Sequence, residues 1–148
     1  MSTEKVPVDV QETVLRLVHP KFFDAALPLP VQPEAFRPLD DEPEGISVMR
    51  RRFVERPEDA LLMAAESKRE LYYVAEIPVS ELQRLGLSAS PDPTADAPGH
   101  ALVPELNSTV YHQDKASKAK CKGIQKELAV IASRNIVHRP PAADSQAS

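Results

Sequence analysis

The 148-residue chain has one cysteine, four glycines, no tryptophan and few other aromatic residues. A single cysteine, Cys121, excludes an internal disulfide and a cysteine-based structural zinc site. We expect Cys121 to pack in a helix rather than to act as a nucleophile. The isolated glycines at Gly45, Gly86, Gly99 and Gly123 exclude the glycine-rich loop of Walker-type and dinucleotide-binding sites. The shortage of aromatic rings argues against a stacking platform for single-stranded nucleic acid.

The chain also lacks recognisable catalytic and metal-binding motifs. Its histidines, His19, His100, His112 and His138, show no His-Glu-x-x-His spacing, and no Gly-x-Ser-x-Gly elbow is present. We therefore predict no metal site, although histidines far apart in the sequence leave one open. No apolar run near the N-terminus is typical of a signal peptide or a membrane span. The sequence thus predicts a soluble, cytoplasmic protein without a membrane partner.

Proline, by contrast, is abundant, with fifteen residues. The stretch Ala25–Glu44 is rich in proline, which excludes a regular helix or central strand there. Its leucines, valine and phenylalanine predict a long connection that wraps the body. A chain of this length allows one ordinary domain. We predict disordered ends at 1–10 and 138–148, with a single α+β domain at 11–137 between them.

Four segments have the β-branched and aromatic residues typical of strands: Glu12–Val18, Gly45–Met49, Leu71–Ile77 and His100–Val103. The only charge in Leu71–Ile77 is Glu76, so both faces of that strand are expected to be covered. The sequence predicts a small mixed β-sheet covered by two or three helices. Val110 and Tyr111 are compatible with a further strand.

Three segments predict the covering helices: Pro57–Lys68, Ser80–Leu85 and Lys115–Arg134. Proline followed by two acidic residues is typical of the first turn of a helix, which favours a start at Pro57. Ser80 is a candidate N-cap, and Gly86 ends the second helix. In the third helix, apolar residues recur at spacings of three and four, which defines one buried face.

Basic residues define the candidate binding surfaces. Arg50 and Arg52 lie at the end of a predicted strand, where alternation places both on one face. The last helix presents a second set on one face, namely Lys115, Lys118, Lys122 and Lys126. Residues 1–106 hold eleven Lys and Arg against nineteen Asp and Glu, so the body is acidic and the last helix is basic. This asymmetry suits a protein partner or self-association, and the acidic body argues against nucleic acid.

Two histidines suggest a residue-level hypothesis for chemistry. His19 and His100 each lie at the end of a predicted strand, where polar groups often face a cleft. If the two strands are neighbours, the imidazoles converge with Ser47 or Glu66, and histidine suits proton transfer near neutral pH. The simpler interpretation, which we favour, is that both histidines form hydrogen bonds at the strand ends.

Several short motifs resemble a family of small uncharacterised bacterial proteins. These motifs are VLRLVHP, AFRP, GISVMRR, PEDA, LQRLGL, DP and GHALV, which together cover about residues 13–106. The resemblance implies a bacterial, cytoplasmic protein and no particular activity.

The order of elements is also similar to short NAD-consuming domains of the ADP-ribosyltransferase type, named for an Arg-Glu-Ser set. Arg16 matches the arginine of their first strand, and Pro57 to Glu66 matches their Pro-Glu-x-Ala helix that ends in glutamate. The chain departs from that group in having Ala35-Phe36-Arg37-Pro38 in place of a Gly-Gly-Arg-Trp segment. The resemblance implies NAD as cofactor or substrate, with Arg16 and Glu66 as catalytic residues. Under this enzyme alternative, His19 and His100 from the preceding hypothesis join the catalytic set.

The leading functional hypothesis is a small soluble bacterial accessory protein that binds a protein partner and has no chemistry or cofactor of its own. The alternative is an NAD-consuming enzyme of the ADP-ribosyltransferase type, or a degenerate relative of one.

Overall fold

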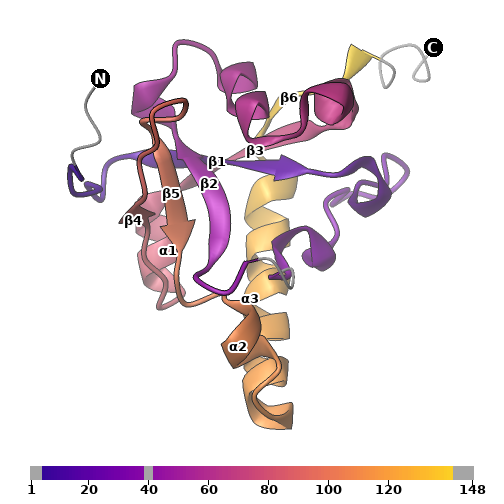
Figure 1. The fold of residues 1–148 in the computed structure, drawn as a ribbon. Helices are drawn as coiled ribbons and strands as arrows, with labels where there is room; N and C mark the ends of the chain where they lie inside the picture. Colours follow the sequence, from indigo (N-terminus) through magenta and orange to yellow (C-terminus); the bar gives the residue numbers. More distant parts are fainter. Residues whose placement is uncertain (1–4, 39–41, 142–148) are drawn as a thin grey trace.

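The computed structural model describes residues 5–38 and 42–141, and its centre is a six-stranded sheet (Figure 1). The strands lie in the order β4-β5-β2-β1-β3-β6, and every pairing among them is antiparallel. Their bounds are Thr13–Val18 (β1), Ile46–Arg50 (β2), Tyr73–Pro78 (β3), Ser90–Pro91 (β4), His100–Val103 (β5) and Ile136–His138 (β6). The α+β class and the four predicted strands are confirmed. The sheet is antiparallel rather than mixed, because no strand joins a parallel neighbour through a crossover helix.

Short helices connect and cover these strands. Five are 3-10 helices, namely Pro20–Phe22 (η1), Pro33–Phe36 (η2), Arg51–Phe53 (η3), Pro57–Met63 (η4) and Glu66–Leu71 (η5). Three are α-helices, namely Val79–Arg84 (α1), Ser108–Tyr111 (α2) and Lys115–Ser133 (α3). No helix within the described residues is both long enough and apolar enough to span a membrane.

Hydrophobic side chains cover both faces of the sheet, as alternation along the strands requires. On β1, Val14 and Val18 point to the larger cluster, which includes Leu128 of α3. Leu15, between them, points to a smaller cluster with Ala60 of η4. The sheet therefore lies between α3 and η2 on one face and η4 on the other.

The last helix forms as predicted, and mainly its second half packs on the body. Asp114 is the N-cap and accepts a hydrogen bond from the Ser117 N–H. Leu128, Ala129 and Ala132 are buried against the sheet and η2. The first half of α3 projects away from the sheet together with α2 (Figure 1). Packing of the second half thus compensates for lysines at the N-terminal end, which oppose the helix dipole.

The helix predicted over 57–68 is confirmed as helical, but it does not form one continuous helix. The segment forms η4 and η5, separated at Ala64, whose backbone is extended. The Arg69 Nε donates to the Ala64 carbonyl at 3.1 Å, and the Lys68 N–H bonds the Ala65 carbonyl instead. A side chain therefore satisfies the carbonyl that would continue an α-helix through this point.

Other short segments refine the prediction. Gly86 ends α1 with φ of 77°, as expected, but the N-cap position is Pro78 rather than Ser80. Val110 and Tyr111 belong to α2, not to a strand, because Asn107 caps the helix by accepting from the Val110 N–H.

The chain ends contribute more than expected. Of the predicted disordered N-terminus at 1–10, the described part supplies the Val6 and Pro7 carbonyls to Arg50. At the other end, His138 belongs to β6 and Pro140 is buried. The rest of both predicted tails, at 1–4 and 142–148, lies outside the described residues.

Candidate functional site

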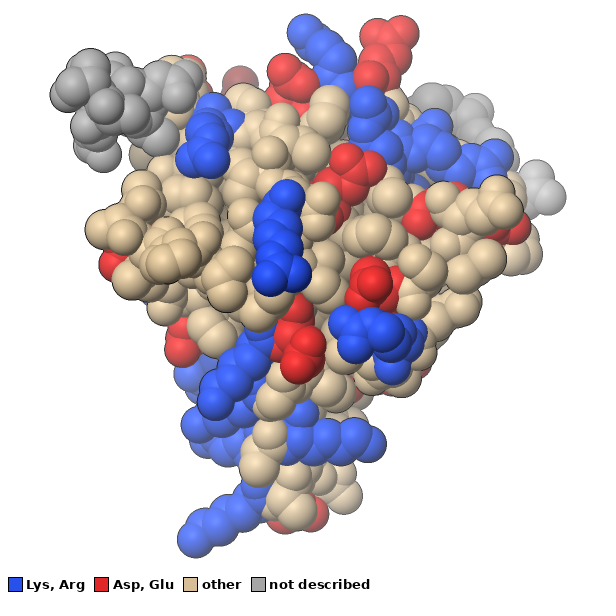
Figure 2. Space-filling view, turned by 180° about the vertical axis from the view of Figure 1, so that it is seen from behind, with Lys and Arg blue, Asp and Glu red and all other residues tan. Residues whose placement is uncertain are grey.

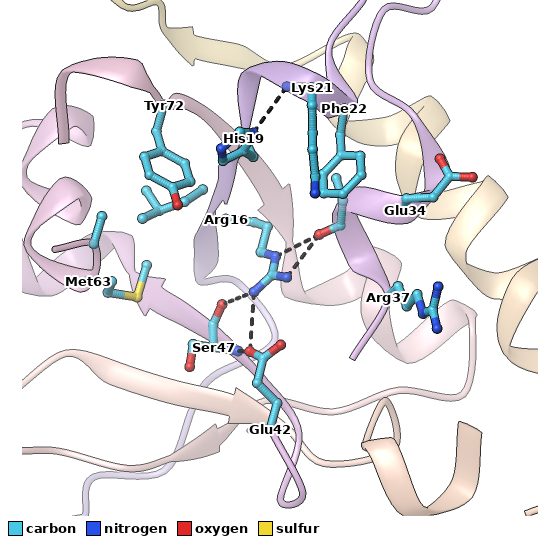
Figure 3. A pocket seen from close by; sticks show the side chains of 13 residues that line it. Arg16, His19, Lys21, Phe22, Glu34, Arg37, Glu42, Ser47, Met63 and Tyr72 are labelled. Atoms are coloured by element: carbon cyan, nitrogen blue, oxygen red, sulfur yellow. Dashed lines mark hydrogen bonds and ion pairs between the residues drawn. The ribbon is translucent and has the colours of Figure 1, made fainter. Parts of the chain in front are cut away.

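One hollow, which we call the central cleft, opens where β1 and β2 separate. The two strands pair only at Val14 with Arg50 and at Leu15 with Met49. The cleft has a volume of about 430 Å³. Its polar lining includes Arg16, His19, Lys21, Glu34, Arg37, Glu42, Ser47 and Tyr72 (Figure 3).

Arg16 fills the gap between the diverging strands. Its Nε and Nη2 donate to the Ala35 carbonyl at 3.0 and 2.9 Å, and its Nη1 donates to the Ser47 carbonyl at 2.9 Å (Figure 3). The Glu42 carboxylate lies 3.7 Å from Nη1. Burial lowers the pKa of Arg16 and the Glu42 charge raises it, with a net lowering. The guanidinium thus joins β1, β2 and η2 by bonds that the strand ladder does not supply.

His19 lies in the same cleft and is held as a neutral imidazole. Its Nδ1 accepts a hydrogen bond from the Lys21 N–H at 3.1 Å, so the ring proton is on Nε2. Its ring makes edge contacts with Phe22 and Tyr72. Burial, followed by the charges of Lys21 and Lys68, lowers the pKa of His19. The predicted hydrogen bond at a strand end is confirmed for this residue.

The structure brings only half of the predicted catalytic set together. Arg16, His19 and Ser47 line the central cleft, whereas Glu66 is exposed at the start of η5 and is not part of the lining. His100 lies on β5, where its Nδ1 is 3.0 Å from the Asp92 carboxylate. Convergence of the two histidines is therefore wrong, because β2 separates β1 from β5 in the sheet.

Arg50 is a structural residue, and its predicted role as a binding residue is wrong. Only 1% of Arg50 is exposed. Its Nε and Nη2 donate to the Glu12 carboxylate at 2.9 and 2.7 Å, and its guanidinium also bonds two backbone carbonyls. The strand ends at Arg50 and η3 follows, so the alternation that placed Arg50 and Arg52 together does not hold. Arg52 is 55% exposed and lies 3.6 Å from Glu12.

A second hollow, which we call the basic groove, lies between η2 and the projecting half of α3. Its volume is about 260 Å³. It is lined by Pro33, Glu34, Arg37, Tyr111, Lys118, Lys122, Gln125 and Lys126. Lys and Arg side chains gather over this narrow lower part of the molecule (Figure 2). The predicted Lys118, Lys122 and Lys126 therefore share a concave surface, and Lys115 precedes them on the same helix.

Two cations of the basic groove contact one aromatic ring. The Arg37 guanidinium carbon lies 5.1 Å from the centre of the Tyr111 ring, and the Lys118 Nζ lies 5.3 Å from it. Cation–π contact of this kind holds a charged side chain in place. Tyr111 itself is buried. The ring thus fixes two positive charges from different elements at one end of the groove.

Gln125 is the one polar side chain of α3 that the fold buries among the described residues, with 3% exposed. Its Nε2 has no hydrogen-bond partner in the described part of the chain. Gln125, Arg37 and Tyr111 were not among the binding residues predicted from the sequence. One feature of the sequence could have identified Gln125 as a buried polar residue. It lies four residues after Cys121 and three before Leu128, on the apolar face of the helix.

Among residues 5–38 and 42–141, no group of three or more His, Cys, Asp or Glu side chains is placed to hold a metal ion. The Cys121 thiol is buried, and burial raises its pKa, which disfavours the reactive thiolate.

The fold and these hollows define an α+β protein with a mixed-charge central cleft and an adjoining basic groove, and Glu34 and Arg37 line both. Comparisons with protein-family models, with curated proteins and with solved structures find no match for the chain.

Proposed function

We propose that the protein is a small bacterial, cytoplasmic accessory protein that binds an acidic surface of a protein partner through the basic groove. The main support is the projecting half of α3. Within the described residues, the lysines of this half form no ion pair with a carboxylate, while the other half packs on the sheet. A charged face without internal ion pairs is available to a complementary surface.

The charge distribution favours a protein over a nucleic acid as the partner. Five lysines lie in α3, with Glu127 as its only acidic residue, whereas residues 1–106 have a net charge of −8, from eleven basic and nineteen acidic residues. An extended polyanion would meet repulsion from the body, but a compact acidic patch would meet the groove alone. The acidic body of a second copy of the chain also has a suitable charge. The same groove could therefore mediate self-association.

Charge reversal in the groove tests the proposal. Wild-type protein and Lys118→Glu/Lys122→Glu are compared for capture of partners from the source cells at low and physiological salt, with light scattering for self-association. We expect the variant to lose at least about tenfold in affinity, because two attractive charges become repulsive. Its Tm should change by no more than about 4 °C, since Lys122 is exposed and the half-buried Lys118 loses one cation–π contact with Tyr111.

The matched control is Lys5→Glu/Lys68→Glu, which makes the same change in net charge at two exposed lysines outside the groove. We expect this control to behave as the wild type. Equal capture by both double variants would refute the groove as the partner surface.

The second candidate function is NAD consumption of the ADP-ribosyltransferase type. The supporting observation is that Arg16 and His19 line one cleft together with Tyr72. It ranks second because every bond of Arg16 described above serves the fold and Glu66 lies outside the cleft lining. If NAD is consumed, NAD should raise the Tm, and His19→Gln and Glu66→Gln should abolish turnover without unfolding. Turnover that survives both substitutions would exclude this mechanism.

A further inference from the structure

The buried amide of Gln125 is the least expected feature of the basic groove. An amide nitrogen that is buried without a partner destabilises the free protein, because it has lost its hydrogen bonds to water. Leucine would fit the same stripe of α3, between Cys121 and Leu128, without this cost. A binding role explains the amide better than a packing role, because a ligand that enters the groove could accept its hydrogen bond.

The cations around Gln125 indicate which ligand would do so. Arg37, Lys118, Lys122 and Lys126 bring four positive charges to the lining, and Glu34 brings one negative charge. The groove therefore has three positive charges in excess. A carboxylate would neutralise one of them, whereas a phosphate monoester carries roughly −1.5 to −2 and has three strong acceptor oxygens.

The donors also differ in kind, and both kinds bind phosphoryl groups. Arg37 offers a planar guanidinium, which binds phosphate oxygens in pairs, and the lysines offer compact charges. The Tyr111 ring limits the movement of Arg37 and Lys118 before any ligand arrives. Gln125 adds a buried neutral donor without a partner of its own. Side chains held in advance lose less entropy on binding than free lysines would.

We propose that the basic groove is a binding site for a phosphate monoester presented by a phosphoserine or phosphothreonine of the partner protein. The proposal rests on the function proposed above and specifies the chemical group that the partner presents. A protein-borne phosphate fits better than a nucleic-acid backbone, because the four cations converge on one hollow while the body of the protein is acidic.

The test is calorimetric titration of the full-length protein with short peptides. The probes are Ala-phosphoserine-Ala, Ala-Glu-Ala and Ala-Ser-Ala, with inorganic phosphate and a short single-stranded oligonucleotide as further arms. We expect the phosphopeptide to bind at least tenfold more tightly than the glutamate peptide, and the serine peptide not to bind. Inorganic phosphate should compete with the phosphopeptide.

Gln125→Leu removes a hydrogen-bond donor from the groove without changing its charge, so it tests hydrogen bonding to the phosphate apart from charge attraction. The control is Gln83→Leu, on the exposed face of α1. Removal of an unpartnered buried donor should keep or raise the Tm of Gln125→Leu. Its affinity for the phosphopeptide should fall by at least about tenfold, because hydrogen bonds to charged groups are the stronger class. Gln83→Leu should change neither quantity.

These experiments distinguish a failure of the phosphate-site proposal from a failure of the proposed partner surface. Equal affinity for the phosphorylated and glutamate peptides, or unchanged phosphopeptide affinity in Gln125→Leu, would overturn the phosphate site. Partner capture that still depends on Lys118 and Lys122 would then leave the proposed function standing. Tighter binding of the oligonucleotide than of the phosphopeptide would overturn the choice of a protein-borne phosphate.

Discussion

Arg50 and Arg52 provide a direct comparison between a buried and an exposed arginine that approach the same carboxylate. Arg50 lies 2.7 Å from Glu12 with 1% of its side chain exposed, and Arg52 lies 3.6 Å from Glu12 with 55% exposed. Arg50 also donates to the Val6 and Pro7 carbonyls and lies over the Phe53 ring at 4.6 Å. The same substitution to methionine at each position therefore removes very different interactions.

The expected cost follows from burial. Arg50→Met leaves the Glu12 carboxylate, which is 7% exposed, without its main partner. Loss of one member of a buried pair costs about 3–5 kcal/mol, whereas exposed ion pairs contribute about 0–1 kcal/mol. We therefore expect Arg50→Met to lower the Tm by about 6–20 °C and Arg52→Met by at most about 4 °C.

Urea unfolding at pH 7 measures the free energy of unfolding that each of the two variants loses. With a slope near 2 kcal/mol per M, Arg50→Met should lower the midpoint by about 1.5–2.5 M, and Arg52→Met by at most about 0.5 M. The double variant Glu12→Leu/Arg50→Met should recover much of the loss, because apolar replacements of a buried pair are often tolerated. Equal midpoints for Arg50→Met and Arg52→Met would refute a structural role specific to Arg50.

Three further predictions concern stability and reactivity. Gly45→Ala should destabilise the fold by about 1–3 kcal/mol in urea unfolding, because Gly45 has φ of 129° and a Cβ would lie 2.5 Å from the Val103 carbonyl oxygen; unchanged stability would contradict this geometry. Burial raises the pKa of Glu12, but hydrogen bonds and the charges of neighbouring arginines outweigh it, so the folded pKa lies below 4.5. The stability that the ionised Glu12 contributes is therefore present above about pH 4.5 and is lost as the pH falls through the lower pKa of the folded state. In urea unfolding, the difference in unfolding free energy between wild type and Glu12→Gln should become smaller in acid. A difference that stays constant with pH would contradict a lowered pKa. Finally, Cys121 should react with a thiol reagent only as fast as the protein unfolds, and rapid reaction of folded protein would contradict its burial.

The sequence was sufficient for elements in which local preference and packing agree. The β-branched residues of β1, the run in β3 and the apolar spacing of α3 each predicted an element close to its observed bounds. It was insufficient where one side chain decides the backbone. Arg69 bonds the Ala64 carbonyl and interrupts the predicted helix, and no periodicity in the sequence signals that contact.

The site was partly predictable for the same reason. The lysine face of α3 follows from helical spacing alone, so three of its members were correctly placed together in the basic groove. Arg37 comes from a segment distant in the sequence, and only the tertiary fold brings it to α3. Tyr111 ends α2, just before α3, but the sequence did not show that its ring turns back onto Lys118. Arg50 was misassigned because alternation was assumed to continue past the end of β2.

The most direct test of the account is an amide NMR titration of ¹⁵N-labelled protein with the phosphoserine peptide. If the basic groove is the partner site, shift changes should concentrate on η2, α2 and the first half of α3, with the Gln125 side-chain amide among the largest. Saturating changes around Arg16 and His19 in the central cleft, with α3 unaffected, would contradict the account and favour the NAD-consuming alternative.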